Sequence, residues 1–229
     1  MSTLVRGIDE TVAGLWKVLM TKGVTNAIAG LSQMCEAHIK VSSMNAKHVP
    51  VLEIPDLLGG PKAMVAGVYL QMSGAGDGHI VIVYEPQTAY DMIDMLMGEP
   101  QGTTTEFDEM EQSVLGEVGN VMGSQFLNTL SDSTGLDLRV SPPAVMMDMS
   151  ASILDATLAD LLAQTDEILM IDTTFGTDDQ EINGKFLALP NPELQAKLFV
   201  RLAMPALTPE PPESDSALPS DDTESAEQD

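Results

Sequence analysis

The sequence predicts an α+β fold in which helices cover an antiparallel β-sheet and the two halves of the chain repeat one arrangement. Residues 64–72 and 79–84 are apolar stretches with strand-like alternation, and the glycine-rich stretch 74–78 lies between them. This pattern is typical of a β-hairpin. Residues 106–131 instead repeat apolar side chains with the period of a helix. Because the same order of elements returns in the second half, an internal duplication is the economical explanation.

The first half is expected to place helices before and after its hairpin. Trp16, Leu19 and Met20 follow helical spacing and are expected to pack into the core. Pro86 ends the second strand of the hairpin. The predicted elements are helices over 4–16 and 26–36, where the second either follows the first or continues it across Gly23, then a short apolar run at 39–41, a loop with Pro50 and Pro55, strands 64–72 and 79–84, a helix over 88–97 and a linker over 98–104.

The second half is organised around one long predicted helix, residues 106–131. Thr105 is its expected N-cap, and Asp108 lies where a capping carboxylate could reach back. The elements expected after this helix are a strand over 136–140, a loop at Pro142–Pro143, a helix over 151–163, strands 167–175 and 181–188, and a helix after Pro190.

This central helix has an apolar face and a polar face. One narrow sector is expected to be buried, and it contains Leu115, Val118, Met122 and Phe126. On the opposite side, at i, i+4 and i+7, lie Ser113, Glu117 and Asn120. Such a row is most often only the solvent-facing side of a helix. However, three glycines flank it (Gly116, Gly119 and Gly123), and each costs about 1 kcal/mol against alanine. Something is therefore expected to approach the helix backbone closely.

The two halves can be aligned from this sequence alone. Two dipeptides recur with a constant offset of 99, pairing Leu31–Ser32 with Leu130–Ser131 and Val41–Ser42 with Val140–Ser141. We therefore expect one domain over residues 1–204, with repeats over about 1–100 and about 101–204.

Composition and charge exclude several classes of partner and site. The formal net charge of −25 argues against nucleic acid or an anionic membrane surface as partner. The one cysteine, Cys35, excludes an internal disulfide. The chain also lacks a signal-peptide pattern and any apolar run of about 18 residues, so we expect a cytoplasmic location. With 4% aromatic residues and 16 Met, the core is expected to be aliphatic and filled by methionine.

Residues 205–229 differ in composition from the rest of the chain. They contain five prolines and eight acidic residues, and they have no Lys or Arg. Such a segment buries too little apolar area to fold, so we expect a disordered acidic tail. Without those eight charges the remainder still carries −17. A solubilising tail and a docking arm are both compatible with this composition.

The polar row of the central helix belongs to a longer motif. It reads Ser113-x3-Glu117-x2-Asn120, and Pro143 follows after 22 intervening residues. With this motif and the downstream Val140-Ser141-Pro142-Pro143, the chain resembles the CheC-type phosphatases of bacterial chemotaxis, the group of CheC, CheX and FliY. The likeness extends to about Met204. It implies the CheC-like fold, with two pseudo-symmetric halves.

The resemblance implies hydrolysis of the phospho-aspartate on a CheY-type response regulator. An acyl phosphate needs mainly an aligned water molecule and charge stabilisation. Asn120 is then expected to orient the water and Glu117 to pair with a lysine of the regulator. Ser113 is expected to contact the partner, and Pro143 to shape the adjoining loop. No cofactor or metal of the chain's own is expected, because the regulator would bring Mg²⁺. A CheD-type deamidase is a further candidate partner, and we expect a monomer.

The offset of 99 places a second, degenerate site in the first half. Ser113, Glu117 and Asn120 correspond to Gly14, Val18 and Thr21. Two-site members of the CheC-type group would carry Glu and Asn at the latter two positions. Neither valine nor threonine supplies a carboxylate or a carboxamide, so the first site is predicted to be inactive. Its surface is expected either to help binding or to have become core.

Other chemistries have little support in the sequence. His38, His48 and His79 have no metal-ligand spacing. The stretch Gly74-x-Gly76-x-Gly78 has no following helix, so it is interpreted as a hairpin turn and not a phosphate loop. A non-catalytic, regulator-binding module of the flagellar switch type is the alternative function. Retention of both Glu117 and Asn120 favours the enzyme.

Overall fold

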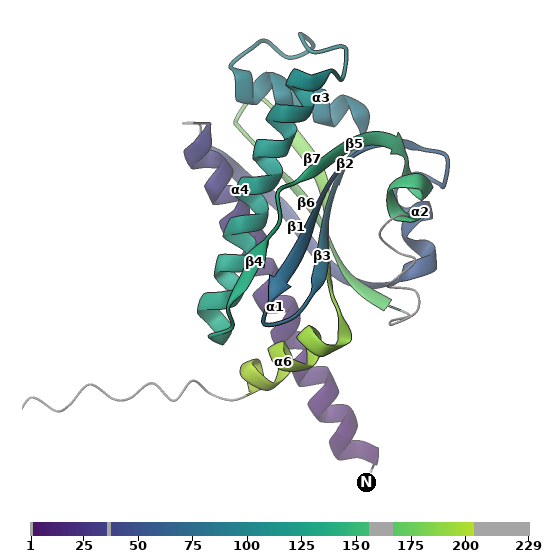
Figure 1. Ribbon diagram of the computed structural model, residues 1–229, viewed down its shortest axis with the longest axis vertical. Helices are drawn as coiled ribbons and strands as arrows, with labels where there is room; N and C mark the ends of the chain where they lie inside the picture. The colour runs from purple at the N-terminus through teal and green to yellow at the C-terminus, as the bar shows by residue number, and fades with distance from the viewer. Residues whose placement is uncertain (1, 36–37, 156–166, 204–229) are drawn as a thin grey trace, which may run out of the picture.

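The structure is a computed structural model, and it describes residues 2–35, 38–155 and 167–203. Within these residues one antiparallel sheet is covered by helices, which confirms the predicted α+β fold (Figure 1). The strands are β1 (Lys40–Pro50), β2 (Met64–Gly74), β3 (Gly78–Tyr84), β4 (Leu138–Val140), β5 (Ala144–Met149), β6 (Glu167–Gly176) and β7 (Glu181–Pro190).

The helices lie on both sides of this sheet. Their bounds are α1 (Ser2–Met34), the 3-10 turn η1 (Val51–Glu53), α2 (Ile54–Leu57), α3 (Pro86–Met97), α4 (Glu109–Thr134) and α6 (Pro192–Ala203), and residues 150–155 are also helical. The two long helices α1 and α4 pack against each other and cover one face, and the short α2 lies on the other side (Figure 1).

The strand order has the symmetry of a duplication. It runs β1-β6-β7-β3-β2-β4, and β5 also pairs with β2. The counterparts in the two halves are β1 and β4, β2 and β6, and β3 and β7. If each strand is replaced by its counterpart, the list becomes β4-β2-β3-β7-β6-β1, which is the same order read from the other end. The register is also similar, because Val41 of β1 pairs with Phe175 of β6 and its counterpart Val140 of β4 pairs with Met72 of β2, although Met72 and Phe175 are 103 and not 99 positions apart. This symmetry agrees with the predicted pseudo-two-fold arrangement. The repeat bounds at 1–100 and 101–204 stay predictions, and the tail at 205–229 lies outside the described residues.

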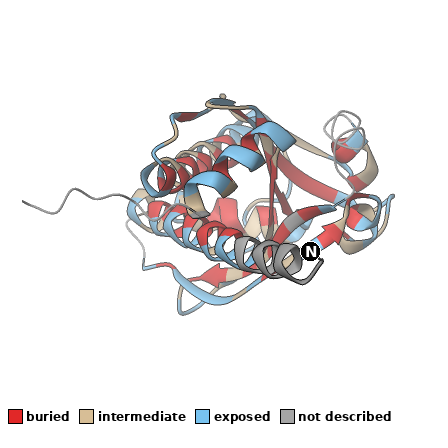
Figure 2. Cartoon of the chain, turned by 90° about the horizontal axis from the view of Figure 1, so that it is seen from below, coloured by how far each residue is buried: buried red, intermediate tan, exposed pale blue. Residues whose placement is uncertain are grey.

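The larger core lies between the sheet and the two long helices. Trp16, Leu19 and Met20 of α1 are buried there, as predicted. The predicted apolar sector of α4 is also buried, and it comprises Leu115, Val118, Met122 and Phe126. Figure 2 shows the buried residues of both helices on the sides that face the interior. The periodicity of the sequence therefore identified the inward faces of both helices.

The N-terminal helix is one continuous element, whereas the sequence left open a break at Gly23. Gly23 is buried beneath the ring of Phe126, and a Cβ at this position would lie 2.6 Å from the ring carbon Cδ2. The glycine therefore allows α4 to approach α1 closely, and it does not end the helix.

One strand, β1, is longer than predicted, and another, β5, is additional. Residues 42–50 were expected to form a loop, but they belong to β1, which pairs with β6 from Lys40 to Pro50. Pro50 is the last residue of this strand, where a missing N–H is tolerated. Strand β5 was not predicted, and the predicted helix over 151–163 is described only to residue 155. The remaining strands and the helices α3 and α6 agree with the prediction to within a few residues.

The N-cap of α4 is Asp108 and not Thr105, so that prediction is wrong. The Asp108 side chain accepts from the backbone at Glu111, and the Glu111 carboxylate accepts from the Asp108 N–H at 3.0 Å. This reciprocal pair is a capping box, which satisfies two N–H groups of the first turn. A carboxylate at the N-cap position therefore starts the helix three residues later than predicted.

The linker before α4 is held by one buried carboxylate, Asp94 of α3. Its oxygens accept the backbone N–H groups of Gly102, Thr103 and Thr104 at 2.7, 3.0 and 2.8 Å, and the Thr104 hydroxyl at 2.6 Å. Burial alone would raise the pKa of this carboxyl, but the hydrogen bonds outweigh burial and lower the pKa below its ordinary value. Asp94 thus fixes the chain segment that connects the two halves.

Candidate active site

The four residues predicted to form the site lie together along one surface groove. This groove has a volume of about 650 Å³ and runs between α4 and the segment that joins β4 to β5. Ser113, Glu117, Asn120 and Pro143 all line it. The remaining lining residues are Gln112, Gly116, Val140, Ser141, Pro142 and Val145.

The polar side of the groove is open to solvent. Ser113 and Glu117 are exposed, and Asn120 is half-exposed. Within the described residues, none of these three side chains has a hydrogen-bond or ion-pair partner. No loop of the described chain covers them, since they line an open groove. A carboxylate and a carboxamide one helical turn apart are therefore available to another molecule.

The opposite side of the groove is apolar. It is formed by Val140, Pro142, Pro143 and Val145, which lie on the edge of the sheet next to β2. A partner that enters this groove would meet an apolar surface on one side and polar groups on the other. Such a combination fits a protein surface better than a free ion.

The glycines of α4 are explained by the sheet of the same chain. A methyl group at position 119 would overlap Cγ1 of Val68, and at position 123 it would lie 3.2 Å from Leu70 and 3.3 Å from Val140. The close approach predicted from these glycines is therefore made by β2 and β4 and not by a partner. Position 116 is less crowded, with 3.5 Å to Val145.

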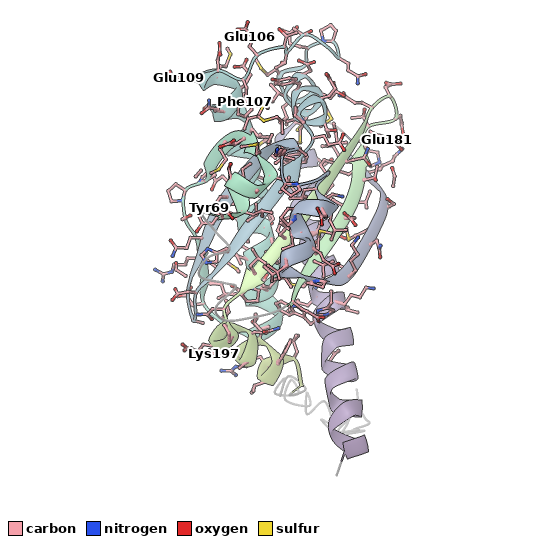
Figure 3. All side chains as sticks on the ribbon, turned by 90° about the vertical axis from the view of Figure 1, so that its right-hand side faces the viewer. Tyr69, Glu106, Phe107, Glu109, Glu181 and Lys197 are labelled. Carbon is pink, nitrogen blue, oxygen red and sulfur yellow. The ribbon has the colours of Figure 1, made fainter. Side chains whose placement is uncertain are left out.

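The surroundings of the groove are acidic. Helix α4 contains four acidic residues and no Lys or Arg. Glu106, Phe107 and Glu109 lie at the end of the molecule opposite α6, which carries Lys197 (Figure 3). Arg139 of β4 is paired with Asp137 at 2.9 Å. The groove is therefore suited to a partner with a cationic group.

The corresponding positions of the first half lie on the surface. Gly14 and Val18 are exposed, Val18 with 66% of its surface accessible, and Thr21 is half-exposed. The suggestion that this region became core is therefore wrong for Gly14 and Val18. It is a surface without the acid and the amide of α4.

Sequence reasoning missed part of the groove. Gln112 donates from its amide to the Phe107 carbonyl at 3.3 Å and lies next to Ser113. Val140, Ser141 and Val145 enter the groove because β4 and β5 both pair with β2. The downstream Val140-Ser141-Pro142-Pro143 motif was the available signal, but strand pairing places these residues against α4.

Two further properties concern metal ions and membranes. Among the residues with described positions, no group of three or more His, Cys, Asp or Glu side chains is arranged to hold a metal ion. None of the described helices combines the length and hydropathy of a transmembrane span.

The fold and the groove together define an α+β protein with an acid and an amide on one exposed helix. Comparison with known proteins shows similarity to the CheC-like family. A model of the CheC-like family matches residues 110–147, which contain Ser113, Glu117, Asn120 and Pro143. The chain is 26% identical over 204 residues to the CheY-P phosphatase CheC of Bacillus subtilis, covering 87% of this chain and 98% of that protein.

Solved structures with the same fold include the following two. FliY of Thermotoga maritima superposes with a TM-score of 0.60 at 18% identity, covering 86% of this chain and 96% of that one. A chain of the CheX–CheY–BeF3–Mg²⁺ complex of Borrelia burgdorferi gives a TM-score of 0.51 at 18% identity, covering 75% and 97%. The predicted resemblance to the CheC-type group is therefore confirmed.

Proposed function

We propose that this protein hydrolyses the phospho-aspartate of a CheY-type response regulator in chemotaxis, using a single site on α4. The observation that carries the proposal is the pair Glu117 and Asn120, which lie unpartnered in an open groove. The similarity to a CheY-P phosphatase over 87% of the chain supports the same activity.

In this proposal, Asn120 holds the attacking water. A side-chain amide has both a donor and an acceptor, so it can fix a water molecule in one orientation. The phospho-aspartate is an activated acyl phosphate, and its hydrolysis depends mainly on alignment and charge stabilisation. The amide therefore needs to reach the phosphoryl group of the partner, as its position in the groove permits.

Glu117 has a different role in the proposal. A carboxylate close to a phosphoryl group would be repelled, so Glu117 is better suited to pair with a lysine of the regulator. Ser113 lies further along the same helix face and would contact the partner. Pro143 would shape the apolar side of the groove.

The proposal assigns no metal or cofactor to this chain, because Mg²⁺ would be held by the regulator. The protein would act in the cytoplasm, as a monomer with one working site. A CheD-type deamidase is a second candidate partner of the same chain.

The decisive experiment follows phosphate release from a phosphorylated regulator. We expect the wild-type protein to accelerate the decay and Asn120→Ala to remove about 100-fold of that acceleration, because an unaligned water attacks slowly. Thr21→Ala, at the corresponding position of the first half, is the matched control and should leave the rate unchanged. Equal rates for wild type and Asn120→Ala would contradict the proposal.

Glu117→Ala tests the docking role. We expect weaker binding of the regulator, by about tenfold, since a charge-assisted hydrogen bond contributes about 1.5–3 kcal/mol. Titration of the variant with the regulator measures this affinity. An undiminished affinity would refute the pairing with a lysine.

The alternative is a non-catalytic binding module of the flagellar switch type. It requires the regulator to bind without any acceleration of phosphate loss. The unpartnered Asn120 favours the phosphatase, because a binding module has no need for a free amide beside the acid.

A further inference from the structure

The groove wall is built at an irregularity in the sheet. Val140 pairs with Met72, whereas Ala144 pairs with Tyr69. Two residues of β2 therefore face the three residues 141–143, which is the arrangement of a β-bulge. Pro142 and Pro143 have no N–H, so the ladder between β2 and this edge cannot continue through them.

Ser141 closes the gap with its backbone and its side chain. Its N–H donates to the Gln71 carbonyl at 2.9 Å, and its hydroxyl oxygen accepts the Gln71 N–H at 2.9 Å. The same hydroxyl donates to the Pro142 carbonyl at 2.9 Å. The Ser141 hydroxyl therefore takes the place of a ladder carbonyl and ties the proline segment to β2.

The tied segment rests directly on α4. A Cβ at Gly116 would lie 3.7 Å from Cγ of Pro143, and one at Gly119 would lie 3.6 Å from its Cβ. The Pro143 ring therefore contacts the helix surface beside Glu117 and Asn120. Because the ring forms one wall of the groove and these side chains form the other, its position sets the width available to a partner.

We infer that Ser141 is a positioning residue that holds the proline wall of the groove at the width the response regulator requires. This inference rests on the proposed function, since the regulator is the molecule that would dock there. Ser141 acts through Pro142 and Pro143, because its hydroxyl is already engaged by the Gln71 N–H and the Pro142 carbonyl. Its loss should therefore weaken docking and leave the chemical step nearly intact.

The first half of the chain supports this role. Its sheet pairing shifts register between Val41 and Ser43, so the bulge is present there too, at Ser42, the counterpart of Ser141. The residues in place of the prolines, Ser43 and Met44, pair regularly with β6, and β1 continues without a break. A serine bulge alone does not make a groove wall. The second half adds the two prolines, and there the hydroxyl replaces the missing ladder bond.

The test compares Ser141→Ala with Ser141→Thr, which keeps the hydroxyl, and with Ser133→Ala, an exposed serine of α4 outside the groove. We expect Ser141→Ala to raise KM for the phosphorylated regulator about fivefold, equivalent to about 1 kcal/mol, with kcat within about twofold of wild type. The Gln71 amide should exchange with solvent faster, by about the same factor. Ser141→Thr should recover both values, and Ser133→Ala should change neither.

The affinity for the regulator loaded with beryllofluoride and Mg²⁺ separates this inference from the proposed function. A wild-type protein that binds this regulator but releases no phosphate would contradict the proposed activity. The inference about Ser141 would stand if Ser141→Ala then lowers the affinity about fivefold. An unchanged KM and affinity in Ser141→Ala, with wild-type activity intact, would overturn the inference alone. A wild-type protein that neither binds nor hydrolyses would overturn both.

Discussion

The two halves of this protein share one scaffold and differ in the surface that it carries. The strand register is symmetric, and the offset of 99 relates α1 to α4 and β1 to the β4–β5 edge. On the second half this scaffold carries Glu117, Asn120 and a proline wall. On the first it carries Val18 and Thr21 beside an unbroken strand. The fold and the polar groups on its surface therefore depend on different residues.

The difference extends to charge. Helix α4 has four acidic residues and no Lys or Arg. Residues 14–34 of α1 have no Asp or Glu, and they include Lys17 and Lys22, which are exposed. In a chain with a net charge of −25, this neutral to basic face is unusual. The two faces therefore differ in charge, and a cationic group is favoured beside α4.

The largest expected effect comes from an attempt to remove the difference between the halves. In an Asn120→Ala background, we expect Val18→Glu combined with Thr21→Asn to leave phosphatase activity about 100-fold below wild type. The restored side chains would still lack a proline wall opposite them, so the regulator would not be aligned. Phosphate release from the phosphorylated regulator measures the rate.

The control for this experiment places the same two substitutions in the wild-type background, where activity should be unchanged. Recovery of a tenth or more of the wild-type rate in the Asn120→Ala background would show that the wall is dispensable. It would also show that the first half lost its activity through those two side chains alone.

A smaller effect is expected from Asp94, a residue of the first half that holds the linker before α4. Asp94→Asn should lower the free energy of unfolding by about 2 kcal/mol at neutral pH, because the carboxylate accepts four hydrogen bonds from the linker before α4. The pKa of Asp94 is lowered in the folded protein, so its contribution is present above the ordinary aspartate pKa of about 3.9 and is lost as the pH falls below it. Urea unfolding at several pH values checks both.

Glu99→Gln is the matched control, since Glu99 is exposed in the same linker. Its effect should stay within about 0.5 kcal/mol. If wild type and Asp94→Asn differ as much at pH 3 as at pH 7, the ionised carboxylate is not the group that stabilises the linker.

The smallest expected effect comes from adding one methyl group to a glycine in each half. Gly119→Ala should destabilise the protein by about 1 kcal/mol, because the overlap with Val68 outweighs the gain in helix propensity. Gly14→Ala has open space around its Cβ and should stabilise by about 0.5–1 kcal/mol. Chemical denaturation of the two variants measures both changes, and a stabilised Gly119→Ala would mean that β2 retreats from α4 without cost.

The polar side of the site was predictable because it depends on one helix. Residues at i, i+4 and i+7 lie on the same side of any helix, so Ser113, Glu117 and Asn120 could be grouped without knowledge of the fold. The structure places them in one groove, as the spacing indicates. Their chemical roles stay predictions until they are tested.

The elements that were missed depend on contacts distant in sequence. Residues 42–50 contain few strongly strand-forming side chains, and β1 is specified by its pairing with β6. The start of α4 was misplaced because several polar residues precede it. Asp94 binds Thr104 and its neighbours from another helix, which leaves Asp108 as the cap. The proline wall likewise reaches α4 only through pairing with β2.

The fluorescence of Trp16 reports on the contact between α1 and α6, the first and last described helices. Trp16 is the one tryptophan of the chain, it is 2% exposed, and its ring meets Phe199 of α6 edge-on at 5.8 Å. Its fluorescence will therefore report when α6 separates from α1. A titration that perturbs only the groove should leave this emission unchanged, so docking there needs a probe of its own.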